Sequence, residues 1–519
     1  MNTYIGHNWK AFVLGLVMGG LSFSAPSSVH ALEIDWSGQF WSEFNFVHNY
    51  TLDSTGAGLS IDNARLNGQG YYIPAGGNRN ATFQSLFLRL TPKVVVNDNV
   101  ILKSEWWVGD PIFGMFGNGL PQTSDQTQHY STFSRGSLIS AQRFWGEFIS
   151  DFGTIQVGRV PLQWGLGVVW NSGDALWSRY MSTGDAIRWI AKFGSFTFAP
   201  SMIVPTIGNT IAGSCTVIGQ NCTPGQTGAG GVVDYSLVVK YESAEEDFEG
   251  GLNVIKRLGG VSQDPNSSLT ANGRTSRNIL TYDLYAKKKF NQFSVGAELP
   301  IGTGLVAGTT YKGLGFAGEL GWKASEDWNV LMKFGYASGQ AHANADGSLG
   351  SFDSFYFHPN YHLGMIMFNY QLAQFHRPQT TNSRAPGGLP QAQLGSPYDN
   401  PIVNAQYIAL STQYKANEQW SIRPSLIYAV APQAAKAGQA FYNYWSRQVT
   451  AANTATRDQS KSLGLELDLG VTFQWDDHFM ITWDNGVYLP GKFYAFSGTP
   501  TENATSAVFA SSVRLGVSF

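Results

Sequence analysis

The chain has 519 residues, of which only 13% are charged and 14% are aromatic. A formal net charge of -3, with no basic run, excludes nucleic acid as an expected partner. With 59 glycines, 23 tyrosines and 33 phenylalanines, the composition favours one very large closed sheet over three or four soluble domains.

Residues 1–31 have the pattern of an export signal. Lys10 precedes the apolar core "AFVLGLVMGGLSF", and small residues lead to an expected cleavage site after Ala31. A permanent helical anchor would need about 20 apolar residues, which this segment lacks. We therefore assign 1–31 to a signal peptide and 32–519 to the mature domain.

From Leu32 onward, segments of alternating apolar and polar residues are joined by short turns and long polar loops. In "LGLELDLGVTFQW" (463–475), for example, all odd-numbered residues are apolar, whereas Glu466 and Asp468 lie on the opposite face. A period of two is that of a strand with unlike faces. In a membrane an open sheet edge is too costly, so repeated two-faced strands behind an export signal predict a closed, transmembrane antiparallel β-barrel.

The number of strands follows from a count of these segments. The scan gives 19 candidates, but the number is even if both termini lie on the periplasmic side. The segment 360–368 is therefore assigned to a long loop excursion at 339–401. The prediction is an all-β barrel of about 18 strands, with 16 as the alternative, short periplasmic turns and long extracellular loops.

Two stretches resemble known families. "FWGEFISDFGTIQVGRVPLQWG" (144–165) is similar to a hairpin of Gram-negative general porins, and "LGLELDLGVTFQWDDHFMITWDNGVYLPGKF" (463–493) resembles the last long hairpin of alginate-export barrels. These resemblances imply an integral protein of the Gram-negative outer membrane that contacts lipid and the barrel-assembly machinery. They disagree on oligomeric state, because general porins are trimers and alginate-export barrels are monomers, so a homotrimer is possible.

If the apolar face points to lipid, charged residues of the other face line the lumen. The predicted pore-lining residues are Arg89, Arg143, Arg159, Arg188, Lys192, Glu105, Glu147, Arg423, Asp468, Asp484 and Arg514.

Arg159 needs a further assumption, because the alternation switches parity after Val157. The interpretation is a strand over 154–170 with a bulge at Gly158 and Arg159, which aims Arg159 inward. In general porins, the resemblance implies, this arginine belongs to a basic ladder at the constriction. With Arg89, Arg143 and Arg188 it could form one basic wall; the alternative is that the lumen charges neutralise one another.

The excursion 339–401 is too long for a passive connection and either narrows the barrel mouth or caps it. Its His358 and His362 are four residues apart, but Pro359 argues against a helix, so no metal site is expected. Enzymatic motifs such as G-x-S-x-G and H-E-x-x-H do not occur. The protein is predicted to be no enzyme and to need no cofactor.

Two further features concern the chain's covalent and terminal structure. Cys215 and Cys222 are predicted to form a disulfide across one loop, because an exported protein meets an oxidising compartment. The last strand, "SSVRLGVSF", ends on Phe519, which resembles the terminal signal that the barrel-assembly machinery reads.

Three functions are open. The first is a channel for passive diffusion of small hydrophilic solutes, and the second is an export pore for an anionic polysaccharide of the alginate-export type. The third is a loop-mediated adhesin or a barrel-bound enzyme.

Overall fold

The computed structural model of the protein describes residues 33–50, 52, 81–109, 139–206, 232–262, 275–306, 309–340, 343–344, 348–370, 372, 401–444, 448–450 and 452–519. The predicted signal peptide (1–31) lies outside these residues, and so do Cys215 and Cys222 with their predicted disulfide.

One sheet contains nearly all the strands. In chain order these are β1 (Glu33–Asp35), β2 (Gly38–His48), β3 (Ala81–Leu90), β4 (Lys93–Asn97), β5 (Val100–Gly109), β6 (Ile139–Ser150), β7 (Gly153–Pro161), β8 (Thr183–Phe193), β9 (Phe196–Thr206), β10 (Val232–Ser243), β11 (Phe248–Ser262), β12 (Thr275–Phe290), β13 (Phe293–Val306), β14 (Thr309–Lys323), β15 (Trp328–Ala337), β16 (Ser351–Phe352), β17 (Ala405–Lys415), β18 (Trp420–Val430), β21 (Ser462–Gln474), β22 (Phe479–Pro490) and β23 (Val508–Ser518). A separate hairpin, β19 (Phe441–Asn443) with β20 (Gln448–Thr450), and the 3₁₀ helix η4 (Lys492–Ala495) lie outside it.

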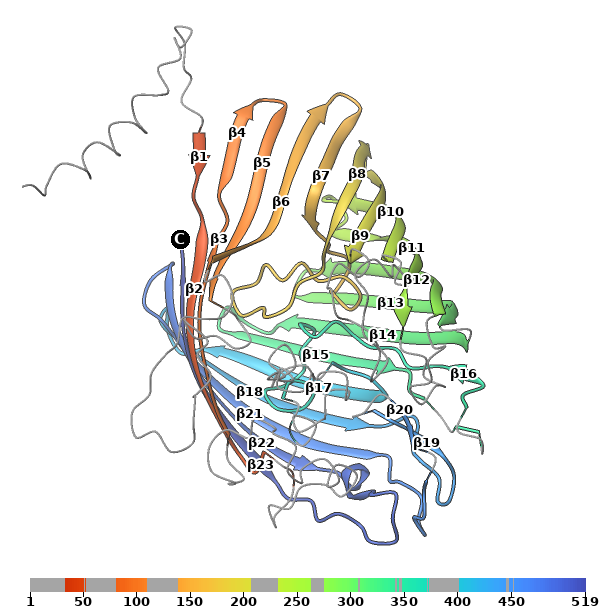
Figure 1. Ribbon diagram of the computed structural model, residues 1–519. Coiled ribbons are helices and arrows are strands. Elements are labelled where there is room, and N and C mark those ends of the chain that lie inside the picture. The colour runs from red at the N-terminus through yellow and green to blue at the C-terminus, as the bar shows by residue number, and fades with distance from the viewer. Residues whose placement is uncertain are drawn as a thin grey trace, which may run out of the picture.

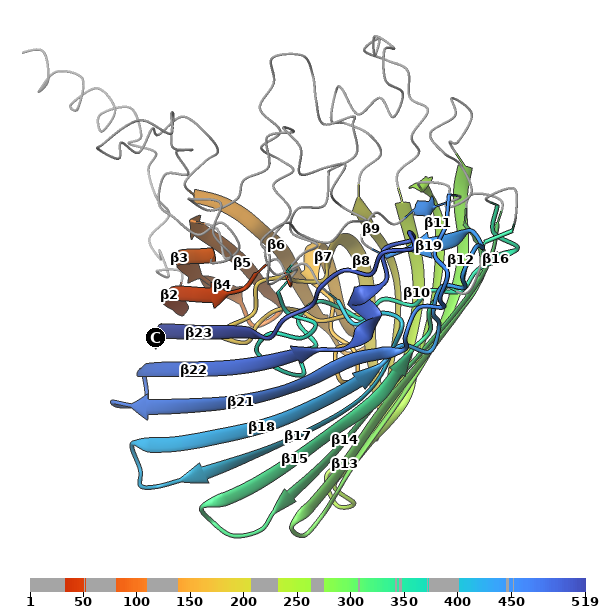
Figure 2. The same ribbon diagram turned by 90° about the horizontal axis from the view of Figure 1, so that it is seen from below.

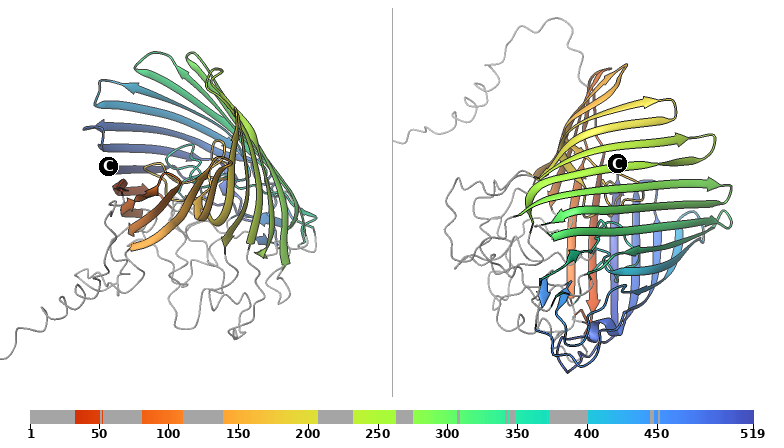
Figure 3. Two further views of the ribbon diagram at one scale, coloured as in Figure 1. Left: turned by 90° about the horizontal axis from the view of Figure 1, so that it is seen from above. Right: turned by 90° about the vertical axis from the view of Figure 1, so that its right-hand side faces the viewer.

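The sheet closes on itself, because β2 pairs with both β3 and β23. β1 and β4 continue β2 and β3, and the two-residue β16 runs parallel to β14. The described residues thus form 18 spanning strands in a closed antiparallel barrel, whose curved wall is seen in Figure 1 and Figure 3. The prediction of 18 strands is confirmed, and the alternative of 16 is wrong.

The connections differ between the two ends of the barrel. At one end the turns are short, as at 151–152, 194–195 and 291–292, and Figure 2 shows the turns of β14–β15 and β17–β18 together at that end. At the other end β15 and β17 are separated by the long stretch 338–404, although β13 and β14 are joined there by only two residues, 307–308. By analogy with outer-membrane barrels, we call the first end periplasmic and the second extracellular.

The outward face of the wall is apolar. Leu467 and Leu469 of β21 are 51% and 46% exposed, whereas the intervening inward residues are shielded inside the barrel. Near the periplasmic turns, aromatic rings gather on the outside: Trp322 stacks on Phe293 with ring centroids 6.1 Å apart. An apolar belt edged by aromatic rings suits lipid tails and headgroups.

The largest hydrophobic cluster lies inside the barrel. Inward residues of the wall, such as Tyr407 and Ile427, pack there against Phe357 and Ile366, which belong to no strand. In the part of the chain that the structure describes, no helix combines the length and the hydropathy needed to cross a membrane. The cluster joins the inner face of the wall to chain segments that are folded into the lumen.

Candidate functional site

Two segments leave the wall and cross the lumen: residues 162–182, between β7 and β8, and residues 353–370, between β16 and β17. Both appear as coils within the barrel in Figure 1. The second segment lies within the excursion predicted at 339–401, and it packs against the inner wall.

The 162–182 segment begins where β7 can no longer pair. Pro161 lacks an N–H to extend the ladder, and Gly165, Gly167 and Gly173 take φ values of +51°, +83° and +73°, which differ from those of a regular strand. Trp164 accepts a hydrogen bond from the Gly167 N–H, which closes a tight turn. The chain is thereby directed into the lumen.

The strand predicted for 154–170 is therefore wrong beyond Pro161. Leu162, Trp164 and Val168, which the apolar face of that predicted strand would turn toward lipid, are buried inside the barrel. The Trp164 ring lies 6.0 Å from that of Tyr285 on the inner wall. Alternation identified an apolar row correctly but not the surface that covers it.

Glu298 of β13 holds the start of this segment. Its buried carboxylate accepts hydrogen bonds from the backbone N–H groups of Leu166, Val168 and Val169, with the latter two at 3.2 and 3.3 Å from Oε1. A Cβ on Gly165 would lie 2.5 Å from Oε2, so only glycine lets the backbone approach this closely. Glu298 was not among the predicted pore-lining residues.

A second pair of carboxylates holds the 353–370 segment. Glu466 of β21 accepts hydrogen bonds from the N–H groups of Ile366 (2.7 Å) and Met367, and Asp468 accepts one from Met365 (3.1 Å). Both acids point inward, as their parity predicts. They bind backbone rather than lining a free passage.

The two segments meet in the lumen. The Asn360 side chain donates to the Tyr180 carbonyl (2.6 Å) and accepts from the Tyr180 N–H (3.1 Å), and the His358 N–H donates to the Val168 carbonyl (2.7 Å). Asn360 also donates to the side chain of Asn171. Together they form one continuous bridge across the barrel.

The two histidines of the 353–370 segment are uncharged at neutral pH. Burial lowers the pKa of His358 to about 4, and its Nδ1 accepts a hydrogen bond from the Asn360 N–H. Burial, reinforced by the positive charges of Arg179, Lys333 and Arg514, lowers the pKa of His362 to about 3.

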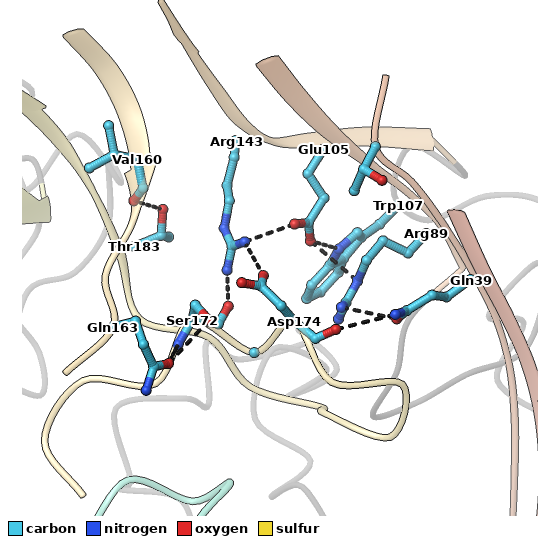
Figure 4. Close-up of polar contacts among 12 residues, drawn as sticks. Gln39, Arg89, Glu105, Trp107, Arg143, Val160, Gln163, Ser172, Asp174 and Thr183 are labelled. Carbon is cyan, nitrogen blue, oxygen red and sulfur yellow. Dashed lines mark hydrogen bonds and ion pairs between the residues drawn. The ribbon is translucent and has the colours of Figure 1, made fainter. Parts of the chain in front are cut away.

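The middle of the 162–182 segment is bound by Arg143 of β6. The guanidinium donates to Asp174 (2.8 Å), to the Ser172 carbonyl and to Glu105 of β5 (2.9 Å), as Figure 4 shows. Burial raises the pKa of Asp174, but the hydrogen bonds and charge of Arg143 outweigh burial and hold it below its ordinary value. Arg89 lies 3.5 Å from Glu105 in the same network.

The structure thus brings the predicted residues Arg89, Glu105 and Arg143 together in one network, whereas the sequence prediction missed their loop partner Asp174. It also missed Arg179, which pairs with Glu43 of β2. The run "NSGDALWSRYMSTGD" (171–185) is rich in turn-forming residues, and that signal indicates a loop rather than a strand at this point.

Trp177 anchors the same region through its ring. It stacks on Trp41 of β2 with centroids 5.5 Å apart, and the Arg514 guanidinium lies 4.8 Å from its ring centroid. Arg514 also pairs with Asp484 of β22, to which Arg423 of β18 donates at 3.1 Å. Three predicted residues therefore form one charged cluster beside the bridge.

Arg159 does not point inward. The pairing of β7 with β6 and β8 runs through Gly158 without a register shift, so Arg159 shares the outward face with Val157 and Phe144. Its guanidinium binds Asp185 of β8 through two contacts, at 2.7 and 3.0 Å. Gly158 instead allows close strand contact, because a Cβ there would lie 2.4 Å from the Phe144 carbonyl oxygen. The predicted bulge and orientation are wrong.

The remaining predicted residues lie on inward positions. Lys103 pairs with Glu147 (3.0 Å). Arg188 is half-buried beside Gln156, and Lys192 is exposed near the periplasmic turn of β8. At the chain end, the backbone of Phe519 exchanges two hydrogen bonds with Gly38, at 2.8 and 3.0 Å.

No family model and no curated protein matches the chain. Solved structures align with nearly all of it. OccK11 (OpdR) of Pseudomonas aeruginosa is 8% identical with a TM-score of 0.45, and the alignment covers 94% of this chain and 96% of that chain. A BenF-like porin from Pseudomonas fluorescens Pf-5 is 8% identical with a TM-score of 0.47, covering 94% and 98%. OmpT, an outer membrane protein of Vibrio cholerae, is 9% identical with a TM-score of 0.35, covering 95% and 99%.

Similarity at this level carries no functional argument, and the fold rests on the strand pairing described above. The resemblance of residues 463–493 to alginate-export barrels gains no support from these structures.

Proposed function

We propose that the protein is a channel of the Gram-negative outer membrane through which small hydrophilic solutes diffuse passively. The observation that carries this proposal is a closed wall with an apolar outer face and a charged inner face. Such a wall has a place in a membrane only if its inner face is hydrated or covered by other chain. On this proposal, the bridge formed by residues 162–182 and 353–370 narrows the lumen.

Paired charges on the inner wall support small polar solutes as the cargo. Lys103 pairs with Glu147 at 3.0 Å, and Lys333 of β15 pairs with Glu319 of β14 at 3.1 Å. Opposite charges on neighbouring strands provide hydrogen-bonding groups without a strong net field of one sign.

Export of an anionic polysaccharide loses its main argument. The four arginines expected to form one basic wall do not meet: Arg159 faces outward, and Arg89 and Arg143 are neutralised by Glu105 and Asp174. Of the four, Arg188 alone faces the lumen with no carboxylate within 4.0 Å among the described residues.

Conductance in a planar bilayer tests the proposal. Refolded protein is expected to give stepwise current, with a reversal potential in a salt gradient that indicates weak ion selectivity. Protein that inserts and retains its barrel but passes no current overturns the proposal. A strong anion preference abolished by Arg188→Gln would instead revive the polysaccharide alternative.

A further inference from the structure

The outward face of β11–β14 carries polar residues where most of the belt is apolar. One register row runs across these four strands as Lys256, Leu280, Thr303 and Lys312. The adjoining row includes Asn278 and Thr310. Two lysines, an asparagine and two threonines thus share one patch, which we call the β11–β14 rim.

These side chains point away from the lumen. Lys256 has the same parity as Leu258, which is 36% exposed, and Lys312 has that of Leu314, which is 39% exposed. The Lys256 Nζ donates to Asn278 Oδ1 across the β11–β12 pair. The inward neighbour Arg257, in contrast, pairs with Asp234 inside the barrel.

Lys312 lies at the extracellular edge of the apolar belt, and Lys256, in the same register row of the tilted strands, lies about 9 Å from it along the membrane normal. Lys312 and Trp322 are ten residues apart on β14, and Trp322 marks the periplasmic aromatic girdle. At about 3.3 Å per residue and a tilt of about 40°, this separation corresponds to about 25 Å along the membrane normal, the height of an outer-membrane apolar band. Lys312 is therefore placed at the level of outer-leaflet headgroups.

Among the described residues, no carboxylate compensates the charge of the rim. Within the part of the chain that the structure describes, neither Lys256 nor Lys312 has a carboxylate within 4.0 Å. Arg159 also faces outward, but Asp185 neutralises it. The two lysines are three strand spacings apart, about 14 Å along the sheet.

We propose that the β11–β14 rim binds the headgroup of a phosphorylated glycolipid of the outer leaflet. Lys256 and Lys312 would each bind a phosphate, since an ammonium group near a membrane surface attracts anionic headgroups. Asn278, Thr303 and Thr310 offer hydrogen-bonding groups to sugar hydroxyls, and the acyl chains would cover the leucines below. This inference rests on the proposed outer-membrane location.

Native mass spectrometry of the refolded full chain with bisphosphorylated lipid A tests the proposal. The double variant Lys256→Gln/Lys312→Gln is expected to bind this lipid about thirtyfold more weakly, from about fivefold per lysine. Lys256→Arg/Lys312→Arg is expected to retain binding. The matched control is Lys288→Gln, which removes an outward lysine at the periplasmic end, beside Phe290.

Unchanged binding by the double glutamine variant overturns the proposal, as does an equal loss in Lys288→Gln or equal binding of dephosphorylated lipid. A change in the number of associated chains, without a change in bound lipid, would assign the rim to contacts between copies and also overturn it. Conductance of the same preparations distinguishes failure of the lipid-binding proposal from failure of the channel proposal. A protein that conducts but does not bind lipid A overturns only the proposed lipid site. A protein that binds lipid A but does not conduct overturns only the proposed channel.

Discussion

Individual carboxylates of the inner wall bind backbone N–H groups of the two lumen segments, which are not part of any strand. Glu298 serves three N–H groups and Glu466 two, and both carboxylates are fully buried. Hydrogen bonds to a charged acceptor contribute about 1.5–3 kcal/mol, and a buried donor left without its acceptor costs a similar amount. The position of each lumen segment therefore depends on very few side chains.

Replacing Glu298 with glutamine is expected to release the start of the 162–182 segment. The amide keeps the size but loses the charge and turns an N–H₂ group toward backbone donors, at a cost of about 2–4 kcal/mol. Limited proteolysis after refolding should show faster cleavage within 162–182 than in the parent. Glu242→Gln, which alters an exposed pair with Lys240, is the control and should leave the rate unchanged. Equal rates in Glu298→Gln and the parent would contradict the tether.

Arg143→Gln should lower the free energy of unfolding by about 3–5 kcal/mol, because it leaves Glu105 and Asp174 without their buried cation. The comparison is Lys436→Gln, which breaks an exposed pair with Asp458 and should cost about 0–1 kcal/mol. Urea unfolding in lipid vesicles measures both. Similar midpoints for the two variants would show that the buried network is not stabilising.

At the scale of elements, the bridge depends on contacts between two segments that each have their own anchor. Asn360 joins them through the oxygen and the nitrogen of its side-chain amide, while Glu298 and Glu466 hold them to different strands of the wall. Each segment can therefore loosen without the other.

Asn360→Ala is expected to separate the segments and leave their anchors intact. Single-channel records should then show larger current fluctuations, at a similar thermal stability of the barrel. Asn417→Ala, in a periplasmic turn, is the control for loss of an asparagine outside the lumen. Records that match the parent would show that the junction does not limit current.

Acid should loosen the 353–370 segment first. His358 and His362 have pKa values of about 4 and about 3 when packed, against an ordinary 6.5, so protonation favours the released segment. The free energy by which the neutral histidines favour the packed segment is fully present above about pH 6.5 and decreases on acidification. A change from pH 7 to pH 5 lowers it by about 2 kcal/mol per histidine.

The ion pair of Asp174 with Arg143 persists over the pH range in which the histidines become protonated. The pKa of Asp174 lies below its ordinary value, so its tether to Arg143 is retained above that value and is lost only in stronger acid. Proteolysis at pH 7 and pH 5 should therefore accelerate within 353–370 but not within 162–182. In His358→Gln/His362→Gln the acceleration should disappear; its persistence would assign the pH effect to other groups.

At the scale of the whole molecule, closure is the property on which the rest depends. β23 meets β2 over their full length, and Phe519 completes the seam through its hydrogen bonds with Gly38. Because the described strands close into a ring, the sheet has no open edge among them that would leave a row of backbone groups unpaired in the membrane.

Deleting Phe519 removes both seam bonds and the predicted assembly signal. The yield of folded barrel in the outer membrane should fall severalfold, measured as the fraction that migrates as heat-modifiable protein in electrophoresis. Refolding of the same variant in detergent separates the two causes: normal refolding there assigns the loss to assembly, and failed refolding assigns it to the seam. A normal yield in cells would contradict both roles.

The sequence alone determined the wall. Alternation with a period of two fixes which residues of a strand share a face, and that local property sufficed for the barrel, the strand number and the inward side of residues such as Arg143 and Asp468. Only the tertiary structure decided what covers the inner face. The apolar row from Leu162 to Val168 meets the inner wall rather than lipid, and Glu298 binds backbone 132 residues away. Arg159 turned outward because its strand continues without a bulge. These outcomes depend on packing between distant parts of the chain, about which a local period carries no information.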